Sequence, residues 1–155
     1  MKTKILFVCL GNICRSPAAE AILKYKIQQM GISSNFTIDS AGTSAHHVGE
    51  RADSRMRKVL SSHGVESTCR SRQLKSQDYN DFDYIIAMDE SNLKSIQRHK
   101  NIIDRNKIFI FTDLAKNKFS HYKGVPDPYY GGEEGFIEVY YLLCHLCDEL
   151  IQKIS

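Results

Sequence analysis

The stretch KILFVCLGNICRSP, residues 4–17, decides the fold. Its first six residues form an apolar run of the length of a β-strand. A short loop follows, and Ser16 with Pro17 then predicts the start of a helix. Ser16 is expected as the capping residue and Pro17 as the first helical residue, where a missing N–H group costs nothing. Apolar residues then recur at near-helical spacing until Gly31, which is predicted to end the helix. A strand, a loop and a helix in this order are typical of an α/β protein.

The rest of the chain repeats this alternation. Further strands are predicted at 36–40, 84–88 and 107–111, and further helices at 53–63, from a cap at Asp89 to about 99, and at 134–154. Near-continuous apolar strands between helices favour a four-stranded parallel sheet flanked by helices on both faces, in a flavodoxin-like winding. With no repeat or linker, residues 1–155 are expected to form a single domain.

Composition excludes several classes of protein. The net charge is +3 and the basic residues are scattered, so no nucleic-acid partner is expected. No apolar stretch approaches the ~18 residues of a membrane span, so no membrane partner is expected. Five cysteines, an odd number, and no recognisable signal peptide predict reduced thiols in the cytoplasm. The histidines lack metal-binding spacing, and CHLC (144–147) is expected to pack in the core, so neither a metal nor a cofactor is predicted.

The loop after the first strand carries chemistry. Cys9 ends the strand, and open α/β sheets bind their ligands at the carboxyl ends of strands. The backbone N–H groups of such a loop and the N-terminus of the next helix favour an oxyanion. The guanidinium of Arg15 matches two oxygens of a phosphate, and the same positive field stabilises a Cys9 thiolate. Together they suit a thiolate that attacks the phosphorus of a bound phosphoryl group.

The leaving oxygen of such a reaction needs a proton. VPDPYYGG, residues 125–132, places Asp127 between two prolines in the long connection before the last helix, and two tyrosines follow it. A carboxyl group there could protonate a leaving phenolate while the tyrosine rings wall the substrate. An acidic turn with surface tyrosines fits this segment equally well.

Four segments in order, VCLGNICRSPAAEAI, DSAGTS, FDYIIAMDESNL and DPYYGG, resemble the low-molecular-weight protein tyrosine phosphatases over nearly the whole chain. The resemblance implies a metal-independent phosphatase that hydrolyses phosphotyrosine and aryl phosphates through a cysteinyl-phosphate. It also implies a role for each matching position. The positions that match catalytic residues are Cys9, Arg15 and Asp127. The phosphate-binding loop is matched by Leu10, Gly11, Asn12, Ile13, Cys14, Arg15 and Ser16. Residues that support this loop are matched by Asn12, Ser16, Ser40 and Asp89, with Ser16 offering its hydroxyl to the sulfur of Cys9, and the cleft wall is matched by His46, Tyr129 and Tyr130.

Two positions depart from the family pattern. His46 of SAHHVGE stands where the wall opposite Tyr129 is commonly tryptophan or tyrosine, which is expected to weaken stacking and to alter peptide preference. Cys69 of TCRSRQL stands where the family often has a histidine in the loop-supporting network, which is expected to loosen that network.

Cys14 has two interpretations. It either packs under the loop as a small side chain, or it captures oxidised Cys9 as a disulfide and makes peroxide inactivation reversible, as the resemblance supports.

Other activities remain open on this fold. An arsenate reductase needs a relay pair of cysteines, and only Cys69 lies in the appropriate region. An arginine-phosphate phosphatase typically has threonine where this loop has Ile13. A non-catalytic phosphopeptide-binding or thiol-sensing module is disfavoured because Cys9, Arg15 and Asp127 are all present. The expected partners are tyrosine-phosphorylated proteins or peptides, with inorganic phosphate as product, and the expected state is a monomer or weak dimer.

Overall fold

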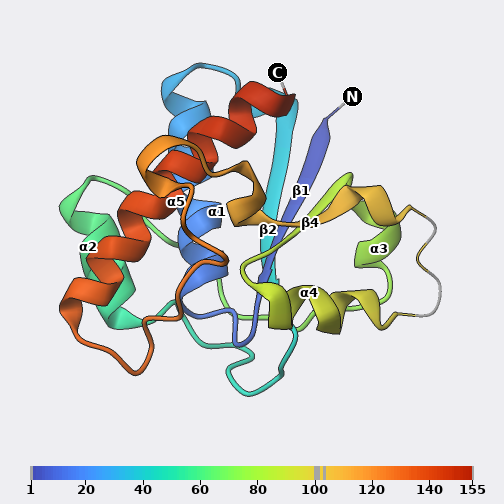
Figure 1. Ribbon diagram of the computed structural model, residues 1–155, viewed down its shortest axis with the longest axis horizontal. Coiled ribbons are helices and arrows are strands. Elements are labelled where there is room, and N and C mark those ends of the chain that lie inside the picture. Colours follow the sequence, from blue (N-terminus) through green and yellow to red (C-terminus); the bar gives the residue numbers. More distant parts are fainter. Residues whose placement is uncertain (1, 100–101, 103, 155) are drawn as a thin grey trace.

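The computed structural model describes residues 2–99, 102 and 104–154. Within these residues four strands form one parallel sheet in the order β2-β1-β3-β4, which confirms the predicted fold class. The strands are β1 (Thr3–Cys9), β2 (Phe36–Gly42), β3 (Tyr84–Ala87) and β4 (Ile108–Ile110). All four run in the same direction, and in Figure 1 the carboxyl ends of β1 and β2 point toward the lower part of the picture.

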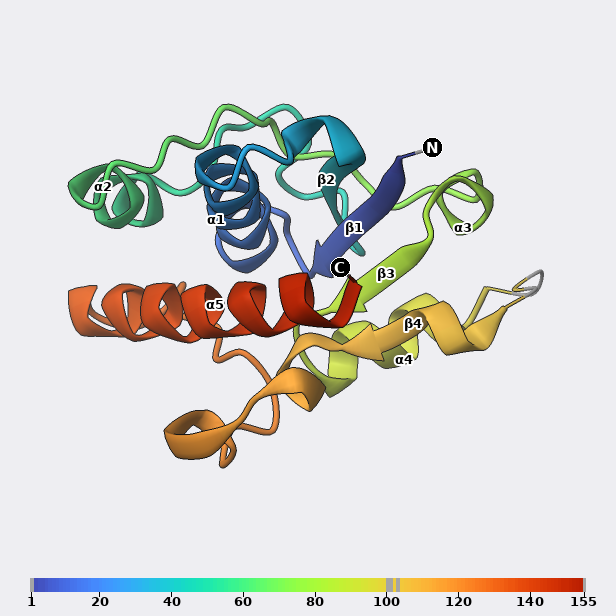
Figure 2. The same ribbon diagram turned by 90° about the horizontal axis from the view of Figure 1, so that it is seen from above.

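Helices cover both faces of the sheet. In Figure 2, α1 and α5 lie on one side of the sheet and α3 and α4 on the other, while α2 packs outside α1 and α5. The α-helices are α1 (Arg15–Gln29), α2 (Ser54–Ser62), α3 (Asp78–Asp81), α4 (Glu90–Gln97) and α5 (Glu133–Ile154); the 3₁₀-helices are η1 (Ser33–Asn35), η2 (Arg105–Lys107), η3 (Phe111–Leu114) and η4 (Asn117–Phe119). No described helix has the length and apolarity that crossing a membrane would require.

The central strand β1 shows why both faces need a cover. Successive side chains of a strand point to opposite faces. Ile5 and Phe7 belong to the core cluster that includes α1 and α5, whereas Leu6 and Val8 belong to the cluster beneath α3 and α4. All four side chains are fully buried. The continuous apolar run in the sequence therefore reflects a strand with no solvent-exposed face.

The predicted helix boundaries were right at some ends and wrong at others. Asp89 caps α4 through a 2.8 Å bond from the N–H of Asn92, and Gly31 follows α1 with φ of 73°. The prediction that Ser16 caps α1 was wrong, because Cys14 is the N-cap and no side chain caps the helix there. Ser16 lies in the first turn, and its hydroxyl is used inside the loop.

Candidate active site

The site is built at the carboxyl ends of β1 and β2, where the loop 10–14 leads from β1 into α1 (Figure 1). The N–H groups of Thr43 and Ser44 donate 2.9 Å bonds to the carbonyl oxygens of Cys9 and Leu10. At Gly42 a Cβ atom would lie 2.8 Å from the carbonyl oxygen of Leu10, so only glycine permits this approach. The end of β2 therefore fixes the floor of the loop.

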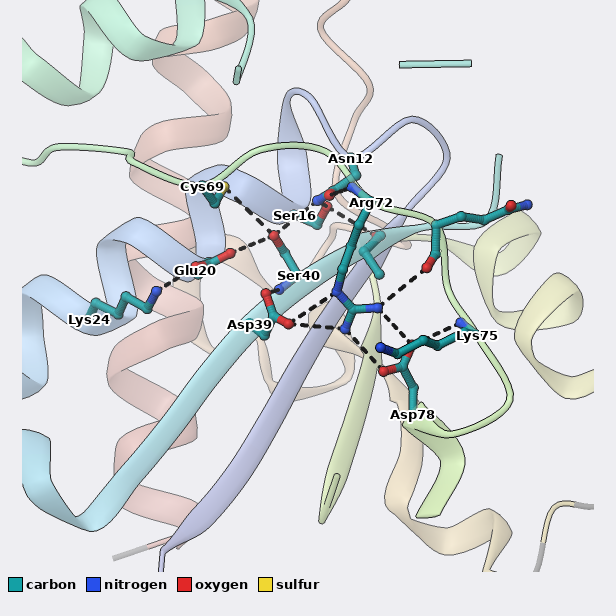
Figure 3. Close-up of polar contacts among 12 residues, drawn as sticks. Asn12, Ser16, Glu20, Lys24, Asp39, Ser40, Cys69, Arg72, Lys75 and Asp78 are labelled. Atoms are coloured by element: carbon teal, nitrogen blue, oxygen red, sulfur yellow. Dashed lines mark hydrogen bonds and ion pairs between the residues drawn. The ribbon is translucent and has the colours of Figure 1, made fainter. Parts of the chain in front are cut away.

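The side chain of Asn12 cross-links the loop to three other segments (Figure 3). Its Nδ2 donates to the hydroxyl oxygens of Ser16 at 2.8 Å and Ser40 at 3.0 Å, and its Oδ1 accepts from the N–H of Arg72 at 2.9 Å. Its backbone has φ of 55°, a left-handed conformation that asparagine tolerates better than most residues. Asn12 thus holds the turn of the loop in one conformation.

A buried chain of polar side chains continues this network behind the loop. Ser40 donates to Oε1 of Glu20 at 2.5 Å, and Oε2 of Glu20 pairs with Lys24 (Figure 3). The sulfur of Cys69 lies 4.0 Å from the hydroxyl of Ser40, and burial raises the pKa of its thiol. The thiol of Cys69 therefore contributes only a weak contact here, while Glu20 supplies the strong acceptor.

Cys9 and Arg15 lie at the two ends of the loop, both almost fully buried. The Cys9 sulfur is 3.0 Å from the hydroxyl of Ser16. Arg15 donates through Nη1 to Oδ2 of Asp89 at 2.6 Å and to the carbonyl oxygen of Val125 at 3.0 Å. The described residues give its Nε no hydrogen-bond partner. One edge of the guanidinium is therefore anchored, and Nε remains available to an anion.

Asp127 reaches the same place from the connection before α5. Its Oδ2 lies 3.7 Å from Nη2 of Arg15, and its Oδ1 accepts a 3.1 Å bond from the N–H of Tyr129. The carboxyl group is 42% exposed. It therefore faces the open side of the cleft, whereas the thiol of Cys9 is buried.

These residues line one cleft of about 480 Å³. Its lining combines the loop, the segment after β2 and the segment after Asp127: Cys9, Leu10, Gly11, Ile13, Cys14, Arg15, Ser44, His46, His47, Glu50, Asp127, Tyr129 and Tyr130. Asn12, Ser16, Ser40 and Asp89 stand behind this lining, where they hold the loop and Arg15. All predicted site residues thus come together at one edge of the sheet.

The wall opposite Tyr129 contains a residue that the sequence did not single out. His46 lines the cleft, but it is the ring of His47 that faces Tyr129, with centroids 6.1 Å apart. Nδ1 of His47 lies 3.0 Å from Oε2 of Glu50, and its Cδ2 packs over Gly11. Two adjacent histidines in one loop are the only sequence signal for this wall.

Arg55 is a second residue that the sequence analysis missed. It pairs with Asp53, donates a 2.9 Å bond to the carbonyl oxygen of Tyr129 and lies 4.5 Å from the ring centroid of Phe136. It therefore ties the segment of Asp127 to α2. The local sequence DSR shows only the pair with Asp53, because Tyr129 and Phe136 lie more than seventy residues away in the chain.

Cys14 lies under the loop with 4% of its surface exposed and has no disulfide partner. Burial, followed by the nearby charges of Asp53 and Cys9, holds the pKa of its thiol far above the usual range. Cys147 is fully buried, in agreement with the predicted core packing of CHLC. Within residues 2–99, 102 and 104–154, no group of three His, Cys, Asp or Glu side chains could hold a metal ion.

A parallel α/β sheet whose first loop is flanked by a buried cysteine and an anchored arginine, with an aspartate from a later connection facing them, is the architecture of a phosphate-binding enzyme. The model of the family "Low molecular weight phosphotyrosine protein phosphatase" matches residues 4–155. The chain belongs to this family.

Individual relatives are similar to this chain over almost its whole length. The low molecular weight phosphotyrosine protein phosphatase of Schizosaccharomyces pombe is 44% identical over 98% of this chain and 97% of its own length. A crystal structure of a protein tyrosine phosphatase from Entamoeba histolytica, with Hepes in its active site, superposes with a TM-score of 0.92 at 45% identity, covering 99% of this chain and 97% of that one. A Drosophila arginine phosphatase superposes with a TM-score of 0.89 at 33% identity, covering 100% and 98%.

Proposed function

We propose that this chain hydrolyses phosphotyrosine and aryl phosphate monoesters through a cysteinyl-phosphate intermediate. The observation that carries the proposal is the convergence of Cys9, Arg15 and Asp127 on one cleft, with the thiol at its floor and the carboxyl group at its open side. A phosphorylated side chain that enters this cleft meets the nucleophile with its phosphorus and the acid with its ester oxygen.

In the first half-reaction the Cys9 thiolate attacks phosphorus and the ester P–O bond breaks. The Ser16 hydroxyl, 3.0 Å from the sulfur, donates a hydrogen bond to the thiolate. The free Nε edge of Arg15 and the loop N–H groups bind the phosphoryl oxygens. Protonated Asp127 gives its proton to the leaving phenolate, which departs as tyrosine.

In the second half-reaction the Asp127 carboxylate takes a proton from water, and the water oxygen attacks the phosphorus of the cysteinyl-phosphate. The S–P bond breaks, inorganic phosphate leaves, and the thiolate is restored. The protonated Asp127 and the Cys9 thiolate are thus both regenerated without a cofactor.

The walls of the cleft support an aryl substrate. Tyr129 and His47 face one another, and the apolar side chain of Ile13 lines the cleft between loop and wall. Aromatic and aliphatic walls favour a flat ring over a small polar group.

The test is turnover of p-nitrophenyl phosphate and of a phosphotyrosine peptide by wild type, Cys9→Ser and Asp127→Ala, each with a chelator present. Cys9→Ser should be inactive. Asp127→Ala should be slower by about 10²–10⁴-fold, the usual contribution of a positioned acid. The loss should be larger for the phosphotyrosine peptide than for p-nitrophenyl phosphate, because nitrophenolate leaves without help from a proton.

Four outcomes would count against the proposal. Full activity in Cys9→Ser would remove the nucleophile from the mechanism. Equal losses for both substrates in Asp127→Ala would remove the proton transfer, and abolition of activity by the chelator would point to a metal. Preferred turnover of a phosphoarginine peptide would favour the activity that names the Drosophila relative.

The same chemistry suggests how the enzyme responds to peroxide. We propose that peroxide converts Cys9 to a sulfenic acid and is itself reduced to water, and that the Cys14 thiol then displaces a second water to form a disulfide, which dithiothreitol reduces. Since burial raises the pKa of Cys14, the capture is expected to be slow. Cys14→Ala should therefore recover less activity than wild type after the same peroxide exposure. Equal recovery would leave Cys14 as a packing residue.

The remaining proposals concern organisation and setting. Residues 1–155 act as a single phosphatase domain, which the family match over 4–155 supports. We propose tyrosine-phosphorylated proteins as substrates, a cytoplasmic setting, and a monomer or weak dimer as the working state.

A further inference from the structure

A second cavity, of about 550 Å³, lies along α2 on the side turned away from α5. It is bounded by one face of the helix, by the segment 64–67 that follows, and by Arg51 at the end nearest the active-site cleft. Its lining is polar: Arg51, Ser54, Arg57, Lys58, Ser61, Gly64, Val65, Glu66 and Ser67. We call this cavity the basic groove.

The lining of the basic groove carries three cations, Arg51, Arg57 and Lys58, and one carboxylate, Glu66, so its net charge is positive. Among the described residues, none of its three cations, Arg51, Arg57 and Lys58, has a carboxylate within 4.0 Å. The neighbouring Arg55 and Arg72, by contrast, are both ion-paired. Residues 51–70 carry five Lys or Arg and two Asp or Glu, a net charge of +3 that equals the charge of the whole chain.

The groove begins where the active-site cleft ends. Glu50 lines the cleft and Arg51, the next residue, lines the groove, so consecutive residues of one segment contribute to both cavities. This segment is fixed to the loop, because the N–H of Asp53 donates a 2.7 Å bond to the carbonyl oxygen of Ile13. On the other side Arg70 donates to the carbonyl oxygen of Gly49 at 3.0 Å and adds a further cation beside this segment.

The dimensions fit a short extended peptide. Ser54 and Ser61 lie seven residues apart on α2, which corresponds to about 10 Å along the helix axis. An extended chain advances about 3.3–3.6 Å per residue, so about three residues span this length. Basic side chains and three serine hydroxyls offer donors for carboxylate or phosphate oxygens. The lining contains no aromatic ring on which a nucleobase could stack.

We infer that the basic groove binds an acidic segment of the substrate, with Asp, Glu or a second phosphorylated residue about two to five positions from the phosphotyrosine held in the cleft. The groove thereby selects acidic phosphotyrosine peptides over neutral ones. The inference rests on the proposed function, because the phosphotyrosine must occupy the cleft while its neighbours occupy the groove.

The test compares kcat/KM for two phosphotyrosine peptides of equal length, one with acidic and one with neutral flanking residues. It uses wild type, the double variant Arg51→Glu/Lys58→Glu, and the control Lys2→Glu/Lys94→Glu. The control changes the net charge equally at two exposed lysines that line neither cavity. The acidic-to-neutral ratio should fall about tenfold in the groove variant and stay near the wild-type value in the control, because exposed ion pairs act over short distances. Raising the salt concentration should lower the wild-type ratio.

Binding of the same peptides to the Cys9→Ser variant separates this inference from the phosphatase mechanism. If Cys9→Ser binds the acidic peptide more tightly, and the added changes Arg51→Glu/Lys58→Glu remove this preference, the groove is supported. Failure of the wild type to turn the peptides over would overturn the proposed chemistry, but it would leave this binding result intact. Equal ratios in all three proteins, or an equal fall in both double variants, would overturn the groove.

Discussion

Replacing Asn12 tests whether one side chain holds the loop 10–14, which is proposed to bind phosphate. Asn12→Ala removes three hydrogen bonds of 2.8–3.0 Å, to Ser16, Ser40 and the N–H of Arg72. At about 1 kcal/mol for each bond, the free energy of unfolding should fall by about 3 kcal/mol. Alanine must also adopt the left-handed φ of 55°, which costs roughly 1 kcal/mol more.

The matched variant Asn12→Gly separates these two contributions. It loses the same three hydrogen bonds but adopts the left-handed conformation freely, so it should be more stable than Asn12→Ala by about 1 kcal/mol. Urea denaturation followed by circular dichroism measures both values. A loss of about 3 kcal/mol corresponds to a Tm lower by about 6–12 °C for a chain of this size.

Activity should fall more steeply than stability. The loop positions Cys9 and Arg15, and a displacement of about 1 Å can cost about 10²-fold in rate. Turnover of p-nitrophenyl phosphate well below the transition temperature measures this loss. If both variants lost less than about 0.5 kcal/mol and kept wild-type turnover, the claim that Asn12 holds the loop would be refuted.

Three further predictions concern neighbouring elements. Arg55→Lys should lower kcat about three- to tenfold, because lysine cannot hold Asp53, the carbonyl of Tyr129 and the ring of Phe136 together. The same change in an Asp127→Ala background should add little further loss of kcat. Additive losses would contradict the claim that Arg55 acts through the position of Asp127. The buried surroundings of Asp53 raise its pKa, but hydrogen bonds from Arg55 outweigh this and hold it below the usual value. The stability from the pair of Asp53 and Arg55 is therefore present above about pH 4 and lost as the pH falls through the lowered pKa. In acid denaturation experiments the stability difference between wild type and Asp53→Asn should shrink as the pH falls. A difference that stays constant with pH would contradict this prediction. Gly42→Ala should lower the free energy of unfolding by about 1–3 kcal/mol, because the added Cβ atom crowds the loop backbone. At the control position Gly132 an added Cβ atom meets no atom within 4 Å, so Gly132→Ala should leave the stability unchanged. Equal effects of the two changes in urea denaturation would refute the crowding.

The order of elements was predictable because it depends on local patterns. An apolar run that is buried on both faces must be a strand in a covered parallel sheet, and β1 is such a strand. Asp89 was recognised as a cap because its role depends only on the N–H three residues later. The same local rule failed at Ser16, since a tertiary partner, the sulfur of Cys9, competes for its hydroxyl.

Some residues of the site were not predicted, because their roles depend on tertiary contacts. Glu20 follows Ser16 by four residues and so shares its helix face, a signal that could have marked it as buried. Nothing local marks Arg55 as a support of the Asp127 segment, or His47 rather than His46 as the ring that faces Tyr129.

The sequence alone determined the strand–loop–helix unit and the family, and it predicted Cys9, Arg15 and Asp127 as the reactive groups, because spacing and order along the chain carry this information. The tertiary structure decided how these groups are held and what surrounds them. The anchoring of Arg15 by Asp89 and the bond from Ser40 to the carboxylate of Glu20 behind the loop join residues that are distant in sequence. Such contacts arise only when the sheet brings the carboxyl ends of its strands together, since parallel strands gather loops from separate parts of the chain at one edge.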